Sequence, residues 1–182
     1  ILSLITLLLA FSHNVNATRQ ARDIIIIDKV EHRLNKVLLY QLDSVTYDAL
    51  QTKLEFGKSS YSANWRGHIS TFEIKDNKLF LNSIYTSRTH TDFKDLLDKY
   101  MEKKGRVFAS WVSGTFICGT GECIYVARNG FDSVYEQETE LVVKNGVIVS
   151  SRTYTNKTYG AVNLEDASRK ISQAFDLSKI NA

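Results

Sequence analysis

Hydrophobic and polar residues alternate most regularly between residues 64 and 87, which read NWRGHISTFEIKDNKLFLNSIYTS. A period of two places successive side chains on opposite faces of a β-strand. Asp76 and Asn77 tolerate positive φ, so they predict a two-residue turn between two antiparallel strands. A slip of one residue would scatter the apolar side chains over both faces, so the pattern favours one register. That register pairs Phe72 with Leu81 and Ile74 with Leu79 on one face, and Ile69 with Ile84, Thr71 with Asn82 and Glu73 with Phe80 on the other.

The remaining pattern predicts an α+β fold. Asn129-Gly130 and Asn145-Gly146 are strong hairpin signals. Helical periodicity is clearest in residues 92–103, where Phe93, Leu96, Leu97 and Tyr100 share one face. We therefore expect a mostly antiparallel twisted sheet, either open or curled into a barrel, with two or three helices. Strands are predicted at residues 22–30, 36–42, 107–118, 123–127, 131–135, 140–143 and 147–151, and helices at 44–54 with Ser44 as N-cap, 92–103, and 163–175 with Asn163 as cap.

The central hairpin also resembles a pattern in an uncharacterised family of bacterial proteins. The apolar run DIIII at residues 23–27 resembles the opening strand of the same proteins, and this chain has His68 where the pattern usually has Tyr. The resemblance implies a similar fold and a bacterial source, and it implies no activity. The residues that carry it are Trp65, Arg66, Gly67, Thr71, Phe72, Glu73, Ile74, Lys75, Asp76, Leu79, Phe80 and Leu81.

Residues 1–17, ILSLITLLLAFSHNVNA, have the pattern of the end of a secretory signal peptide. The apolar run has the length of a signal h-region, and Val15-Asn16-Ala17 fits a small-residue cleavage site. The alternative is a transmembrane anchor, but eleven apolar residues fall short of the roughly 20 that span a bilayer. We expect one globular domain at residues 18–182, exported to the periplasm or the extracellular space, with no membrane span after signal removal.

Composition excludes some classes of partner. The chain has 182 residues, enough for one domain with a real core, and a net charge of +3 from 23 basic and 20 acidic residues. This bias is too weak to indicate binding to nucleic acid or an anionic membrane. Proline is absent, so Gly, Asn and Asp must form the turns.

Cys118 and Cys123 are the only cysteines in the sequence. If Thr120-Gly121 forms a tight turn, the two cysteines face each other with Cα atoms about 4.5 Å apart, at the short end of the disulfide range. In an oxidising compartment a disulfide across this hairpin is the favoured interpretation. Two alternatives stay open: a pair of free buried thiols, and a metal or catalytic role, although two cysteines cannot complete a structural zinc site.

Three residues are of the types enriched at binding hot spots: Trp65, Arg66 and Trp111. The competing interpretation is that aromatic residues in strands belong to the core. We take these three as the candidate binding residues of an exported, non-enzymatic binding or envelope-associated protein, with a protein as one expected partner.

The alternative function is a hydrolase that acts on an envelope polymer. His32, His68 and His90 show no metal-ligand spacing with a second His or Cys, and His68 and Glu73 lie five residues apart, on opposite faces of a straight strand. We therefore assign no catalytic residue, metal or cofactor. A histidine beside a carboxylate in a cleft would favour the hydrolase.

Overall fold

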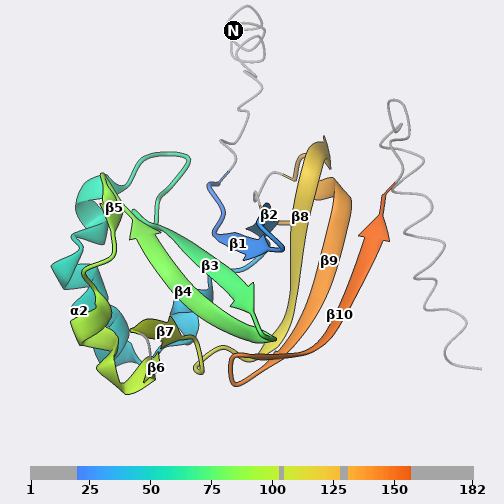
Figure 1. Ribbon diagram of the computed structural model, residues 1–182. Helices are drawn as coiled ribbons and strands as arrows, with labels where there is room; N and C mark the ends of the chain where they lie inside the picture. The colour runs from blue at the N-terminus through green and yellow to red at the C-terminus, as the bar shows by residue number, and fades with distance from the viewer. Residues whose placement is uncertain (1–19, 103–104, 128–130, 157–182) are drawn as a thin grey trace, which may run out of the picture.

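The computed structural model describes residues 20–102, 105–127 and 131–156, and it is rich in β-strands (Figure 1). The signal peptide predicted at residues 1–17 and the helix predicted at 163–175 lie outside the described residues. In chain order the elements, with η for a 3-10 helix, are β1 (Ile24–Ile27), β2 (Val30–Leu34), η1 (Leu38–Gln41), α2 (Ser44–Lys53), η2 (Phe56–Ser59), β3 (Ile69–Lys75), β4 (Lys78–Tyr85), β5 (Thr89–His90), η3 (Lys94–Tyr100), β6 (Met101–Glu102), β7 (Arg106–Phe108), β8 (Gly114–Tyr125), β9 (Val134–Lys144) and β10 (Val147–Thr155).

The strands form one mostly antiparallel sheet in the order β10-β9-β8-β2-β1-β3-β4-β7-β6, with β5 paired to β4. The exception is β1, which runs parallel to β3. A further contact between β10 and β4, at Val147 and Lys78, closes a ring of strands. Because this closure is confined to the ends of the two hairpins, the two halves of the sheet diverge away from it, as Figure 1 shows. The predicted α+β fold with a barrel-like sheet is confirmed.

The central hairpin β3–β4 follows the predicted register next to its turn and departs from it farther away. Asp76 and Asn77 form the turn with φ of 52° and 56°, and the pairs nearest to it are as predicted. A β-bulge between Thr71 and Phe72 then shifts the pairing, so that Thr71 faces Ser83 and not Asn82. The bulge restores burial on the core side, because Ile84 is fully buried whereas the prediction placed it on the other face.

The helices differ from the prediction at their ends. The N-cap of helix α2 is Asp43, one residue earlier than the predicted Ser44, and its side chain accepts a hydrogen bond from the Thr46 amide at 3.0 Å. The long helix predicted at 92–103 is the shorter 3-10 helix η3, which is kinked at Leu97 and is followed directly by strand β6. Residues of the predicted apolar face still pack into the core, since Phe93 and Leu97 are fully buried.

Of two strand predictions in the N-terminal part, the first contains strand β1 but extends too far, and the second is wrong. The predicted strand 22–30 is interrupted by a hairpin turn at Asp28 and Lys29, whose φ values are 49° and 70°, and β2 follows it. The predicted strand 36–42 is the 3-10 helix η1, which places Leu38 and Leu39 in the core. A short apolar run does not by itself separate a strand from a helical turn.

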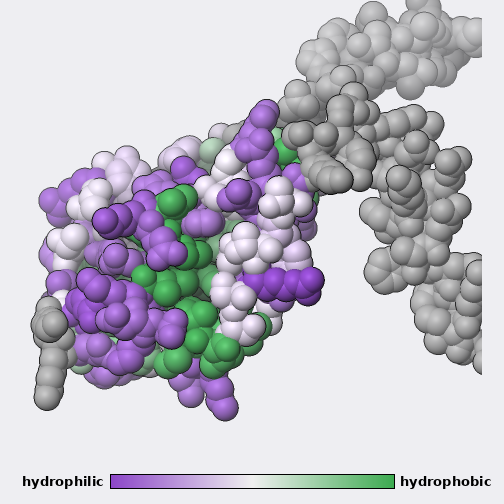
Figure 2. Space-filling model, turned by 45° about the vertical axis from the view of Figure 1, so that its right-hand side comes forward, coloured by the Kyte–Doolittle hydropathy of each residue, from purple (hydrophilic) through white to green (hydrophobic). Residues whose placement is uncertain are grey.

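The apolar core fills the space between the sheet, α2 and the 3-10 helices. Its largest fully buried side chains include Phe56, Phe72, Phe93 and Phe116. Strand β10 lies outside this core: nearly all its residues are exposed, among them Val149. Figure 2 shows a band of apolar side chains on one face of the molecule, between hydrophilic side chains on one side and mostly residues of intermediate hydropathy on the other. None of the helices among the described residues is long and apolar enough to cross a membrane.

Candidate functional site

The three predicted binding residues lie in three different environments. Trp65 is 61% exposed, in the loop before β3. Arg66, the next residue, is buried and paired with Asp23. Trp111 is half-buried, packs edge-on against Tyr100 and donates a hydrogen bond to the Leu38 carbonyl at 3.3 Å. Of the three, Trp65 presents most of its side chain to solvent, whereas Arg66 is closed off from a partner by burial.

The predicted cysteine hairpin is wrong, because β8 runs without a turn from Gly114 to Tyr125. The sequence Gly-Thr-Gly produces a bulge in β8 and not a turn, since the register shifts between Thr120 and Cys123. Cys118 lies opposite Thr139 and Cys123 opposite Tyr135, both on the neighbouring strand β9.

Cys118 and Cys123 are therefore free thiols and not the predicted disulfide. Five residues along one strand separate their Cα atoms by about 15 Å, beyond the reach of a disulfide. Burial raises the pKa of Cys118 to about 12, so this thiol is protonated and unreactive at neutral pH.

A sealed polar cluster lies where β1 and β3 run side by side, and we define it by Asp23, Arg66, His68 and Ser70. All four are buried, and the side chains of Asp23 and Arg66 are 0% and 1% exposed. Asp23 Oδ1 accepts hydrogen bonds from the Ser70 amide at 3.0 Å and from Arg66 Nη2 at 3.4 Å. Arg66 Nη2 also donates to the Ala21 carbonyl at 2.8 Å. The cluster thus ties the start of β1 to the loop before β3.

His68 is held as a neutral imidazole within the sealed cluster. Its ring stacks on Phe56 with centroids 4.3 Å apart, and Nδ1 lies 3.3 Å from the Arg66 carbonyl, which can only accept. Nδ1 therefore carries the proton. The Asn64 side-chain amide, in the orientation that pairs donor with acceptor, brackets the His68 peptide at 3.1 and 3.3 Å.

Burial sets the protonation of this cluster. It raises the pKa of Asp23 to about 6, against the opposing effects of Arg66 and of the Ser70 amide. It lowers the pKa of His68 to about 4, assisted by the positive charge of Arg66. Within the described ranges, four polar atoms of the cluster have no hydrogen-bond partner: Asp23 Oδ2, Arg66 Nη1, His68 Nε2 and Ser70 Oγ. Because the whole cluster is closed off from solvent, it cannot receive a ligand without local opening.

A second polar cluster lies open to solvent, between the end of α2 and the β4–β5 hairpin. It lines a hollow of about 330 Å³, which we call the Arg88 cleft. The three-residue loop of the hairpin supplies one wall, and its turn is closed by a hydrogen bond from the Thr86 amide to the Arg88 carbonyl at 2.9 Å. The lining residues are Lys53, Leu54, Glu55, Lys58, Thr86, Ser87, Arg88 and His90.

Two residues that line the Arg88 cleft, Thr86 and His90, form a series of a hydroxyl and an imidazole that continues to the carboxylate of Asp92. His90 Nε2 lies 2.8 Å from Thr86 Oγ1, and His90 Nδ1 lies 3.4 Å from Asp92 Oδ1. Thr86 and His90 are 4% and 6% exposed, whereas the Asp92 side chain is mostly exposed. In the tautomer with the proton on Nδ1, the ring donates toward Asp92 and accepts from the Thr86 hydroxyl.

The cations that line the Arg88 cleft differ in whether they already form ion pairs within the protein. Lys53 Nζ contacts both Asp95 oxygens, at 2.6 and 2.8 Å, and this hydrogen bonding lowers the pKa of Asp95. Lys58 pairs with Glu55 at 2.5 Å. The Arg88 guanidinium forms no ion pair or hydrogen bond within the described residues. It is therefore the cation that can engage an anion without breaking an existing pair.

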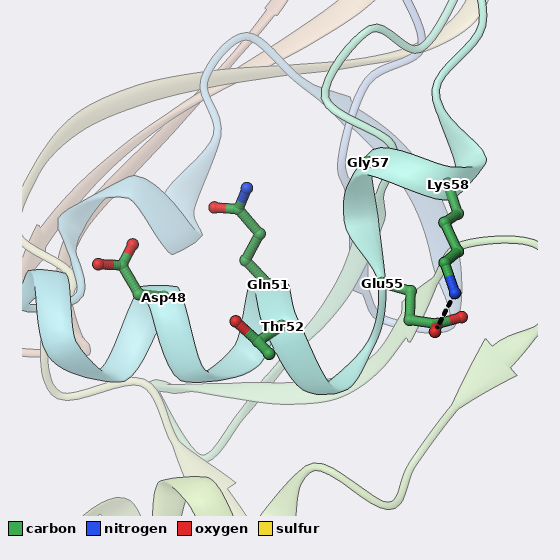
Figure 3. A pocket seen from close by; sticks show the side chains of 6 residues that line it. All are labelled: Asp48, Gln51, Thr52, Glu55, Gly57 and Lys58. Carbon is green, nitrogen blue, oxygen red and sulfur yellow. Dashed lines mark hydrogen bonds and ion pairs between the residues drawn. The ribbon is translucent and has the colours of Figure 1, made fainter.

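A larger, more open hollow of about 500 Å³ adjoins the cleft and shares Glu55 and Lys58 with it. Figure 3 shows that Asp48, Gln51 and Thr52 approach it from α2, while Lys58 comes from η2 and meets Glu55. Glu55 follows α2 in the left-handed conformation, with φ of 53°. This strained residue bends the chain away from the helix and places its side chain between the two hollows.

Sequence reasoning named His90 only as one of several histidines and missed the other residues of the cleft. A signal was present in residues 86–92, TSRTHTD, which combine hydroxyls, a guanidinium, an imidazole and a carboxylate. The third histidine, His32, lies on β2 opposite Ile25 of β1, and its Nδ1 has no hydrogen-bond partner in the described part of the chain. In the part of the chain that the structure describes, no three His, Cys, Asp or Glu side chains are placed to hold a metal ion.

No family model, curated protein or solved structure matches this chain. The features of the chain that bear on its function are therefore the geometry of the Arg88 cleft and the pattern of residues 1–17.

Proposed function

We propose that the protein is a non-enzymatic binding protein that takes an anionic group in the Arg88 cleft. The observation that carries the proposal is the Arg88 guanidinium, which has no partner among the described residues and lies at the wall of a solvent-accessible hollow that Lys53 and Lys58 also line. A guanidinium offers a planar fork of donors that matches a carboxylate, phosphate or sulfate. The hydroxyls of Thr86 and Ser87 add donors of the kind that bind such oxyanions.

The proposal places this binding protein outside the cytoplasm. Export to the periplasm or the extracellular space, and association with the envelope, rest on the signal-like pattern of residues 1–17. N-terminal sequencing of the protein recovered from an exporting bacterial host tests this part: a mature chain beginning near Thr18 supports it. An intact N-terminus on protein that stays in the cytoplasm contradicts it.

Calorimetric titration with inorganic phosphate, sulfate and acetate tests the anion site. We expect saturable binding of at least one anion that weakens as ionic strength rises and is lost in Arg88→Gln. Arg152→Gln, which removes an exposed arginine on β10, is the matched control and should bind as the wild type does. Equal binding by Arg88→Gln and the wild type, or binding of none of the three anions, contradicts the proposal.

A hydrolase is the second candidate, and the contacts from Thr86 through His90 to Asp92 favour it. In such a reaction Thr86 Oγ1 would attack an ester carbonyl while His90 Nε2 takes the hydroxyl proton and returns it to the leaving alkoxide. Water activated by the same imidazole would then release the acid and regenerate Thr86. We rank this candidate second because the hydroxyl and the imidazole lie almost entirely below the surface.

Hydrolysis of p-nitrophenyl acetate separates the two candidates. A hydrolase requires turnover that falls at least a hundredfold in both Thr86→Val and His90→Gln. Turnover that is equal in the wild type and both variants excludes the Thr86 mechanism and leaves the binding function in place.

A further inference from the structure

We propose that the natural ligand is an extended polar chain with charges of both signs, whose anionic group contacts Arg88 and whose cationic group contacts Asp48. This inference rests on the proposed function and names its ligand class. It starts from the contiguity of the two hollows, which share Glu55 and Lys58 as a common wall. A ligand seated in one hollow therefore has the other directly beside it.

The two hollows differ in charge. Apart from Glu55 and Lys58, which line both, the larger hollow presents the carboxylate of Asp48, whereas the Arg88 cleft presents Lys53 and Arg88. Most of these charges are already neutralised within the protein, because Lys58 pairs with Glu55 and Lys53 pairs with Asp95. The existing pairs leave little net charge at the shared wall.

Among the charged residues that line the two hollows, Asp48 and Arg88 are the ones without an ion-pair partner in the described part of the chain. Among the described residues, neither side chain takes part in an ion pair or a hydrogen bond. They lie in different hollows and have opposite signs, with the Glu55–Lys58 pair between them (Figure 3 shows this pair and Asp48). An ammonium group can pair with the Asp48 carboxylate, and a carboxylate or phosphate can pair with the Arg88 guanidinium. A ligand that carries both groups can therefore form both ion pairs at once.

We call the two adjoining hollows together the groove. The part of it between Asp48 and the Glu55–Lys58 pair suits a polar ligand backbone. Gln51 and Thr52 line it from α2 with an amide and a hydroxyl, which can both donate and accept hydrogen bonds. The groove wall follows the surface from α2 to the β4–β5 hairpin and is not a closed cavity for a small apolar molecule. A peptide with a free carboxylate and a lysine-like ammonium is the simplest chain of this class.

Three matched peptides test the inference by titration calorimetry with the whole protein. The first is N-acetyl Lys-Gly-Gly with a free carboxylate, the second replaces Lys by Gln, and the third carries a C-terminal amide in place of the carboxylate. We expect the first to bind two- to fivefold more tightly than the second, the range for a solvent-exposed ion pair, and the third to bind weakest. The series Lys-(Gly)n with n from one to four should show an optimum length.

Variants at each end separate this inference from the proposed function. Asp48→Asn should bring the affinity of the lysine peptide down to that of the glutamine peptide and leave the latter unchanged. Asp98→Asn, an exposed carboxylate on η3, is the control and should change neither affinity. If both peptides bind equally to the wild type and both lose binding in Arg88→Gln, the dipolar ligand is excluded and the anion site stands. If Arg88→Gln changes neither affinity, the proposed function fails as well.

Discussion

The sealed cluster and the Arg88 cleft are built from similar chemistry, and burial gives them different roles. Each contains an arginine, a histidine and a hydroxyl residue, with an aspartate inside the sealed cluster and one, Asp92, in contact with His90 of the cleft. In the sealed cluster Arg66 is locked to Asp23 and to backbone carbonyls, while in the cleft Arg88 has no internal partner among the described residues. A buried charge requires compensation within the protein, whereas an exposed one is compensated by water or by a ligand. Residue type alone therefore does not identify a binding site.

The closest packing beside the sealed cluster is at Gly67, which has φ of +74°. A Cβ there would lie 1.6 Å from the Phe56 carbonyl oxygen, so Gly67→Ala forces the backbone apart in addition to a strained φ. We expect a loss of about 5 kcal/mol or more in the free energy of unfolding, measured by urea denaturation.

Gly57→Ala is the matched control for this substitution, because nothing lies within 4 Å of its Cβ position. We expect it to change stability by less than about 1 kcal/mol. Similar stability of the two alanine variants would mean that η2 does not pack against Gly67 as described.

Removing one partner of the buried ion pair should have the next largest effect. Arg66→Met leaves Asp23 buried without its charge partner, so we expect a loss of about 3–5 kcal/mol in urea denaturation. Lys53→Met removes a cation from the exposed Lys53–Asp95 pair and should lose no more than about 1 kcal/mol. If the two variants lose the same amount, the contrast between the sealed and open clusters is wrong.

The two titratable groups of the sealed cluster should give opposite pH dependences. The folded-state pKa of His68 is lowered to about 4 from 6.5, so its contribution to stability is present above pH 6.5 and is lost as pH falls through 4. The folded-state pKa of Asp23 is raised to about 6 from 3.8, so its contribution is present below pH 3.8 and is lost as pH rises through 6.

Unfolding at several pH values separates these contributions. Between pH 7 and 5, His68→Gln should lose about 2 kcal/mol less stability than the wild type, since the imidazole no longer takes up a proton on unfolding. Asp23→Asn should lose more stability than the wild type between pH 7 and 5, because it lacks the carboxyl group whose contribution grows as pH falls. Parallel pH profiles for all three proteins would contradict the neutral, buried state of His68.

The smallest effects on stability are expected in the Arg88 cleft. Thr86→Val removes the hydrogen bond to His90 and should cost about 1 kcal/mol, while Arg88→Gln should lie within about 0.5 kcal/mol of the wild type. Thermal unfolding checks both values. A large loss in Arg88→Gln would show that this side chain supports the fold and is not available for a ligand.

Local chemistry in the sequence predicted two of the turns correctly, while the predicted turn at Asn129-Gly130 lies outside the described residues. The turns at Asp76-Asn77 and Asn145-Gly146 have the positive φ values that these residue types tolerate, and the register beside the first was predicted correctly. The same reasoning failed at Thr120-Gly121, where Glu136 accepts a hydrogen bond from the Glu122 amide and the glycines form a bulge within β8. A glycine pair signals a special backbone conformation without specifying whether it is a turn or a bulge.

The candidate site could be predicted only in part, because its residues are distant in the sequence. Lys53 and Arg88 line the same cleft although 35 positions in the sequence separate them. Arg66 contacts Asp23 although these two residues are 43 positions apart. The hot-spot rule selected Arg66 by residue type, yet burial commits that side chain to Asp23. Arg88 was passed over, since no local pattern shows that an arginine lacks a partner.

The sequence by itself determined the strand-rich α+β class and the central hairpin, because alternation and turn chemistry act between near neighbours. Only the tertiary structure decided which polar residues are sealed and which stay open. That division depends on which distant segments pack over each side chain: η2 closes over His68, whereas the end of α2 stops short of Arg88 and leaves a hollow beside it.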